Sequence, residues 1–81
     1  MTVQVFSKPS CVQCAATYRA LTERGIEFTV LDVSEDSDAL QYVKCLGYMT
    51  APVVVTEEEH WGGFRPDKIA ALAARIGEHL S

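Results

Sequence analysis

Four short apolar runs along the chain have the composition of β-strands. Their β-branched and aromatic residues lie between residues that form turns. The runs cover residues 3–6, 27–33, 53–55 and 60–61. The last two are separated by the polar segment 56–59, with sequence Thr-Glu-Glu-Glu, which we predict to be the solvated tip of a β-hairpin.

Three other segments have the periodicity of amphipathic helices. They are residues 13–24, a segment that begins within the acidic stretch 34–38 and is closed by Gly47, and a last segment that begins at Pro66. Apolar residues recur three and four positions apart in each segment, which predicts one buried face per helix. The predicted core residues are Cys14, Ala15, Tyr18, Leu21 and Thr22; Ala39, Leu40, Val43 and Leu46; and Ile69, Leu72, Ala73, Ile76 and Leu80.

The elements therefore follow the order β-α-β-α-β-β-α. Two strands that are joined by a helix are expected to be parallel, with a right-handed connection. We predict the α/β fold class, with a four-stranded mixed sheet and helices on both of its faces. No linker, repeat or low-complexity segment divides the 81 residues, so residues 1–81 are predicted to form a single domain.

Composition and charge narrow the range of functions. The net charge is −4 and there is no basic patch, so nucleic acid is not an expected partner. No apolar run approaches the length of a membrane span, and Met1-Thr2 leads directly into the first predicted strand, so we expect no signal peptide. Three cysteines are too few for the disulfide framework of a secreted domain. We therefore expect a cytoplasmic protein without membrane contact.

The clearest chemical signal is the pair Cys11 and Cys14 at the start of the first predicted helix. Ser10 and Gln13 fit a capping box, which places Cys11 in the first helical turn. Free amides and the helix dipole stabilise an anion there, so Cys11 is expected to ionise more easily than a free cysteine. Cys14 lies one turn later on the same side, close enough to form a disulfide with Cys11. The pattern predicts a redox dithiol, with Cys11 as the nucleophile and Cys14 as the resolving thiol.

The residues alone leave two other interpretations of this cysteine pair open. The thiols could be structural, or they could be half of a zinc site, although Cys45, His60 and His79 lack the spacing of further ligands. We predict no metal site. Cys45 lies outside the apolar stripe of its helix and is expected to be a partly exposed, non-catalytic thiol.

Three motifs together resemble the NrdH-redoxins, a glutaredoxin-like branch of the thioredoxin fold. They are Cys11-Val12-Gln13-Cys14, Thr50-Ala51-Pro52 before the third strand, and the segment 61–66, Trp-Gly-Gly-Phe-Arg-Pro. The resemblance covers essentially the whole chain. The family segment commonly has serine at the second position, where this chain has Gly62.

The resemblance implies a protein disulfide reductase, a small dithiol electron carrier without a bound cofactor other than the redox-active disulfide Cys11–Cys14. In this family the carrier is reduced by thioredoxin reductase and supplies electrons to the large subunit of class Ib ribonucleotide reductase, in deoxyribonucleotide synthesis. A monomer is expected. The resemblance also implies that Pro52 follows a cis peptide bond and presents the backbone of Ala51 to an extended substrate segment.

The resemblance further implies a surface for substrates and partner proteins around the dithiol. The predicted residues of this surface are Lys8, Val12, Gln13, Ala51, Pro52, Trp61, Gly63, Phe64 and Arg65. Some of these have an alternative role: Lys8 could be an ordinary solvated lysine, and Phe64 could cap the apolar core. Trp61 could complete the packing of the hairpin, and Arg65 could form an ion pair with a nearby carboxylate.

The remaining alternative is a glutathione-dependent glutaredoxin, which has the same fold and a different reductant. The Gly62-Gly63 pair is similar to the glutathione-binding turn of those proteins. Phe64 and Pro66, which lacks an amide hydrogen, remove part of what a glutathione carboxylate would bind, so poor turnover with glutathione is expected.

Overall fold

The computed structural model describes the backbone of residues 2–80 and the side chains of residues 2–76. The secondary structure consists of β1 (Gln4–Ser7), α1 (Val12–Glu23), β2 (Thr29–Asp32), α2 (Ser37–Cys45), β3 (Val53–Val55), β4 (His60–Gly62) and α3 (Pro66–Leu80). The order of elements is the one that the sequence predicts.

The four strands form one mixed sheet in the order β2-β1-β3-β4. β1 runs parallel to β2 and antiparallel to β3, while β3 and β4 form an antiparallel hairpin. The predicted sheet is thus confirmed, but β2 is shorter than the predicted segment 27–33. As an edge strand it pairs only with the four residues of β1, and the side chain of Val30 is 48% exposed.

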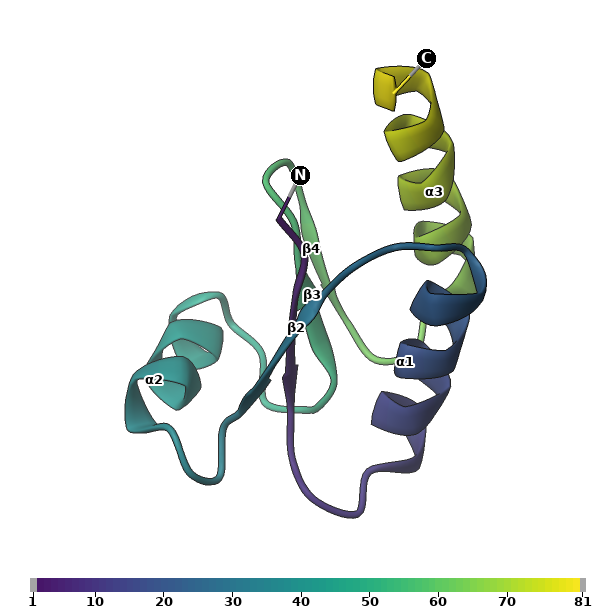
Figure 1. Ribbon diagram of the computed structural model, residues 1–81. Helices are drawn as coiled ribbons and strands as arrows, with labels where there is room; N and C mark the ends of the chain where they lie inside the picture. The colour runs from purple at the N-terminus through teal and green to yellow at the C-terminus, as the bar shows by residue number, and fades with distance from the viewer. Residues whose placement is uncertain (1, 81) are drawn as a thin grey trace.

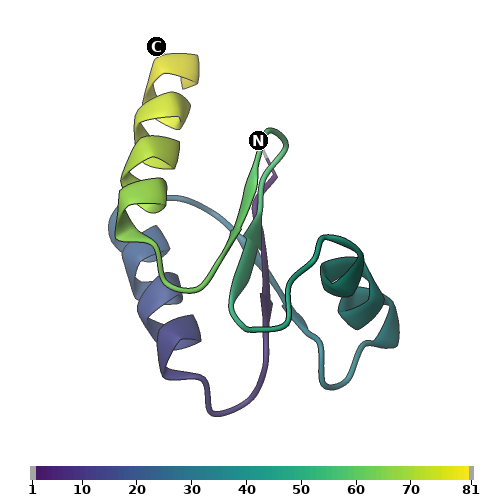
Figure 2. The same cartoon turned by 180° about the vertical axis from the view of Figure 1, so that it is seen from behind.

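Helices cover both faces of the sheet, as predicted. Figure 1 shows α1 and α3 side by side on one face and α2 on the other, and Figure 2 shows the same layers from behind. Alternate residues of the central strands pack on opposite faces of the sheet, because successive strand side chains point to opposite faces. Val5 and Val54 pack in the core under α1 and α3, whereas Phe6, Val53 and Val55 pack in the core under α2.

The buried face of α1 differs from the predicted one. Cys14, Thr17 and Leu21 are buried, while Ala15 and Thr22 are exposed. The helix is therefore rotated so that a threonine faces the core. Its burial is possible because the Thr17 hydroxyl donates a hydrogen bond to the carbonyl of Gln13 at 2.9 Å, which satisfies the polar group.

The predicted apolar stripe of α3 is confirmed as far as side chains are described. Ile69 and Leu72 are fully buried, and Ala73 and Ile76 are half-buried against the same core. Leu80, the last predicted member of the stripe, lies outside the residues whose side chains the structure describes. None of the helices that the structure describes has the length and apolar character needed to span a membrane.

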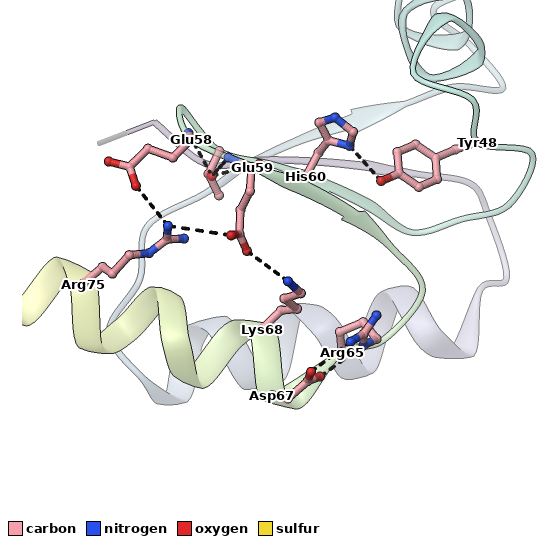
Figure 3. Close-up of polar contacts among 9 residues, drawn as sticks. Tyr48, Glu58, Glu59, His60, Arg65, Asp67, Lys68 and Arg75 are labelled. Atoms are coloured by element: carbon pink, nitrogen blue, oxygen red, sulfur yellow. Dashed lines mark hydrogen bonds and ion pairs between the residues drawn. The ribbon is translucent and has the colours of Figure 1, made fainter.

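The tip of the β3–β4 hairpin is not simply solvated, as we expected it to be. Arg75 of α3 forms ion pairs with Glu58 at 3.0 Å and with Glu59 at 3.7 Å, and Lys68 lies 3.8 Å from Glu59 (Figure 3). The hairpin lies over α3, and the pattern of charges along the chain does not reveal this. The acidic tip thus ties the hairpin to the last helix.

Candidate redox site

Cys11 is the N-cap of α1, the residue immediately before the helix. Its backbone is extended (φ −103°, ψ 109°), and its Sγ accepts a hydrogen bond from the backbone amide of Cys14 at 3.2 Å. The predicted capping box of Ser10 and Gln13 is therefore wrong, as is the placement of Cys11 within the first turn. Ser10 has φ 58°, the left-handed region, whereas a capping residue requires an extended backbone.

This arrangement puts the sulfur where the backbone stabilises negative charge. The first amides of a helix have no partners within the helix, and the helix dipole adds a partial positive charge at the same end. One of these amides, that of Cys14, already points at the Cys11 sulfur. The Cys11 residue is half-buried, whereas Cys14 is buried.

Cys14 has the opposite environment. The residue is 1% exposed, and the pKa of its thiol is raised from an ordinary 9.0 to about 11, chiefly by burial. The hydrogen bond with Cys11 and the charge of the neighbouring sulfur contribute to this rise, while a backbone hydrogen bond with Lys8 and the positive charge of Lys8 act against it. Cys14 is therefore a protonated thiol at neutral pH.

The segment before β3 lies against the dithiol. The Ala51–Pro52 peptide bond is cis, which confirms the expectation from the resemblance. The carbonyl oxygen of Ala51 lies 3.9 Å from Cys11 Sγ, and the carbonyl of Pro52 accepts a hydrogen bond from the amide of Gly63 at 2.7 Å. Gly63 has φ 81°, a conformation that favours glycine. This backbone link joins the cis-proline segment to the loop before α3.

Gln13 makes a second link to that loop, which the sequence analysis missed. Its Oε1 accepts a hydrogen bond from the backbone amide of Phe64 at 3.2 Å, although the two residues are 51 positions apart. No local pattern reveals a contact over this separation. Gln13, Phe64 and Gly63 are thus brought together at the start of α1, as members of the predicted surface.

Exposed apolar side chains gather on the segments that meet at the dithiol. Val12, next to Cys11, is 84% exposed, and Phe64 is 37% exposed. Met49, which the predicted surface did not include, is 86% exposed and lies two positions before Ala51. Its place beside the Thr-Ala-Pro motif was the available signal for it. Exposed apolar groups of this kind are typical of sites that bind other proteins.

Two other residues of the predicted surface, Trp61 and Arg65, make contacts within the protein. Trp61 is 3% exposed and packs in the core under α1 and α3, which is the alternative role considered for it. Arg65 forms a two-pronged ion pair with Asp67 (Figure 3), at 3.1 and 2.9 Å, and this pair raises the pKa of Arg65 and lowers that of Asp67. Lys8 is exposed in the loop before Cys11.

Cys45 is exposed at the end of α2, as predicted. Among the residues that the structure describes, no three His, Cys, Asp or Glu side chains converge in a way that would hold a metal ion. The dithiol therefore has no further ligands for zinc within this part of the chain.

A mixed four-stranded sheet with helices on both faces and two cysteines at the start of α1 is the architecture of a thioredoxin-like redox protein. The family model of the glutaredoxins matches residues 3–61. The glutaredoxin-like protein NrdH of Salmonella typhimurium is 39% identical over 72 residues, which cover 89% of this chain and 89% of the relative. The chain therefore belongs to the glutaredoxin-like NrdH proteins.

Solved structures give the same relationship. The NrdH-redoxin of Escherichia coli matches with a TM-score of 0.86 and 36% identity, over 89% of this chain and 95% of that chain. A buckwheat glutaredoxin in complex with glutathione matches with a TM-score of 0.66 and 25% identity, over 93% and 69% of the two chains. The backbone is thus more similar to the NrdH-redoxin than to this glutathione-bound glutaredoxin.

Proposed function

We propose that this protein is a dithiol electron carrier that reduces protein disulfides through Cys11 and Cys14. The observation that carries the proposal is the difference between the two thiols. Cys11 is half-buried and its Sγ accepts a hydrogen bond from the backbone amide of Cys14, while Cys14 is buried and the pKa of its thiol is raised to about 11. A nucleophile and a resolving thiol need this difference.

The proposed reaction has two steps. The Cys11 thiolate attacks one sulfur of the substrate disulfide, forms a mixed disulfide with it, and releases the other substrate sulfur as a thiolate that takes up a proton. Cys14 then loses its proton and attacks Cys11 Sγ, which forms the Cys11–Cys14 disulfide and releases the second substrate thiol. Two electrons and two protons pass to the substrate, and the carrier is left oxidised.

The neighbouring groups support this chemistry. The backbone of Ala51 beside Cys11 can pair with an extended substrate segment, and Val12 and Phe64 offer apolar contacts to a protein. The amide of Cys14 stabilises the negative charge on the Cys11 thiolate before it attacks the substrate disulfide.

We further propose that thioredoxin reductase reduces the Cys11–Cys14 disulfide and that the large subunit of class Ib ribonucleotide reductase receives the electrons, so that the carrier serves deoxyribonucleotide synthesis in the cytoplasm as a monomer. The family membership supports this choice, and the related Escherichia coli protein is described as having a thioredoxin-like activity profile. A reducing compartment also keeps such thiols in the working state.

The contacts around α3 disfavour glutathione as the reductant. A glutathione carboxylate that binds at the loop before α3 requires free amides or cations in that loop. Here the amide of Gly63 is bonded to Pro52 and the amide of Phe64 to Gln13, while Pro66 has no amide hydrogen. Arg65 is already paired with Asp67.

An assay coupled to NADPH consumption tests the reductant. We expect rapid turnover of a protein disulfide with thioredoxin reductase, and at least about tenfold slower turnover with glutathione and glutathione reductase, because a lost charge-assisted contact weakens binding by that order. The Cys11→Ser variant is the negative control for turnover with either reductant. A protein that accepts electrons from glutathione ten times better than from thioredoxin reductase would belong with the glutathione-dependent glutaredoxins.

A further inference from the structure

The connection between β1 and α1 is short and is fixed at both ends. The carbonyl of Ser7, the last residue of β1, accepts a hydrogen bond from the amide of Val33 at 2.9 Å, and α1 begins at Val12. Only residues 8–11 lie between the two elements, and within them the chain reverses its direction (Figure 1). The backbone angles of four residues therefore decide where the Cys11 sulfur lies.

Three of these four residues have little freedom to make the reversal. Lys8 precedes a proline, which restricts its backbone to extended conformations. The ring of Pro9 holds φ at about −65°. Cys11 is extended, with φ −103° and ψ 109°. The change of direction is therefore concentrated at Ser10, which forms a turn together with Pro9.

Ser10 adopts a backbone conformation that a serine disfavours. Its φ is 58°, and among the residues that the structure describes it is the only one other than glycine with a positive φ. A Cβ atom disfavours this left-handed region, which glycine enters freely and asparagine enters more readily than most residues. The residue is exposed, so packing in the core does not impose the conformation. A strained residue directly before a reactive group points to a role in placing that group.

The turn determines where the nucleophilic sulfur meets its neighbours. Cys11 Sγ accepts a hydrogen bond from the amide of Cys14 at 3.2 Å and lies 3.9 Å from the carbonyl oxygen of Ala51. The raised pKa of Cys14, due chiefly to burial, is partly offset by a backbone hydrogen bond with Lys8, so the start of the turn also contacts the dithiol. Because both ends of the connection are fixed, a different path through Ser10 would move Cys11 Sγ away from the amide of Cys14.

We propose that Ser10 is a positioning residue for the nucleophile: its left-handed backbone places Cys11 Sγ against the amide of Cys14 at the start of α1. The proposal rests on the proposed function, since Cys11 is the nucleophile of that reaction. The contribution of Ser10 is its backbone conformation and not its hydroxyl. The type of residue at position 10 therefore sets how fast Cys11 reacts.

Two substitutions that both remove the hydroxyl test this role. Ser10→Gly permits the left-handed conformation freely, whereas Ser10→Val introduces a β-branched side chain that is rarely found at positive φ. The rate of alkylation of Cys11 by iodoacetamide is measured against pH by peptide mass spectrometry, with the exposed Cys45 as internal reference.

The glycine variant is expected to keep the native rate and pH profile of Cys11. The valine variant is expected to be alkylated at Cys11 about tenfold more slowly at neutral pH, because the thiolate loses a charge-assisted hydrogen bond. Its rate should also begin to rise at a higher pH than in the native protein. The rate of Cys45 is expected to stay the same in both variants.

Two more variants separate the backbone from the side chain. Ser10→Asn changes the side chain but tolerates a positive φ, so it should match the native protein. Ser10→Thr keeps the hydroxyl and is β-branched, so it should react more slowly than Ser10→Asn. The comparison of these two decides the question even if Ser10→Val does not fold.

The outcomes separate this inference from the proposed function. Equal rates and pH profiles in the glycine, asparagine and β-branched variants would overturn the inference and leave the disulfide reductase in place. A loss in Ser10→Gly as large as that in Ser10→Val would assign the effect to the hydroxyl, and a rate lowered by the same factor at every pH would assign it to obstruction of the sulfur. Either result would overturn the inference. Labelling of Cys14 before Cys11 in the native protein would overturn both the inference and the proposed function.

Discussion

In the reduced protein, Cys11 and Cys14 are expected to react with iodoacetamide at very different rates. Alkylation proceeds through the thiolate. The pKa of Cys14 is raised from 9.0 to about 11, so at neutral pH its thiolate fraction is about a hundredfold lower than that of a thiol with the ordinary pKa. Burial slows the reagent further, since Cys14 is only 1% exposed.

The assay follows alkylation by peptide mass spectrometry from mildly acidic to mildly alkaline pH. Cys45 is exposed and provides an internal reference for an accessible thiol. We expect Cys11 to be labelled first and Cys14 to lag behind Cys45 by a factor of about a hundred or more at neutral pH. The lag should persist until the pH approaches the raised pKa of Cys14.

The Cys11→Ala variant separates the causes of the raised pKa. It removes the hydrogen-bond partner and the neighbouring sulfur, but burial, the largest cause, remains. Cys14 should therefore react faster in this variant than in the native protein, and still more slowly than Cys45. The reasoning is refuted if native Cys14 is labelled before Cys11, or within about tenfold of the rate of Cys45 at neutral pH.

Two further predictions concern the same pair of thiols. The pKa of Cys14 is higher in the folded state than in the unfolded state. The stability that its protonated thiol contributes is therefore fully present below about pH 9 and is lost as the pH rises through about 11. The loss in free energy of unfolding is about 3 kcal/mol. The difference in free energy of unfolding between the native protein and Cys14→Ala should narrow by about this amount over that range in urea titrations, and a constant difference would contradict the assignment. Cys14→Ser should accumulate a mixed disulfide between Cys11 and a substrate protein on non-reducing gels, because the resolving thiol is gone, whereas Cys11→Ser should form none. Complexes recovered through Cys14 would reverse the two roles.

The architecture and the position of the dithiol could be predicted because both follow from local patterns. The short β-branched run 53–55 identifies a strand by its length and composition, and the helical period of the stripe that includes Ile69 and Leu72 identifies a helix and its buried side. The spacing of Cys11 and Cys14 likewise fixes their separation along α1. The order of elements then restricts the sheet to a few arrangements.

The contacts that hold the site could not be predicted, since they join residues far apart in the sequence. Gln13 looked like a partner for Ser10, three residues before it, and instead bonds to Phe64. Tyr48 and His60 meet only because the segment before β3 lies along β4. Local reasoning paired Gln13 with a neighbour in the chain, and no sequence pattern indicates either of these long-range contacts.

The strand pairing alone brings three segments of the site together. β1 and β3 are antiparallel with Phe6 opposite Val53, so the chain that leaves β1 toward Cys11 lies next to the chain that enters β3 through Pro52. β3 and β4 are antiparallel with Val53 opposite Gly62, which places the exit of β4 at the same end. The topology of the sheet therefore brings the cis-proline segment and the exit of β4 to the end of the sheet where the dithiol lies. The chemistry of the dithiol depends on where the nearby backbone amides point. The amide of Cys14 is directed at the sulfur of Cys11. The amides of Gly63 and Phe64 already donate hydrogen bonds within the protein, so they do not bind a glutathione carboxylate.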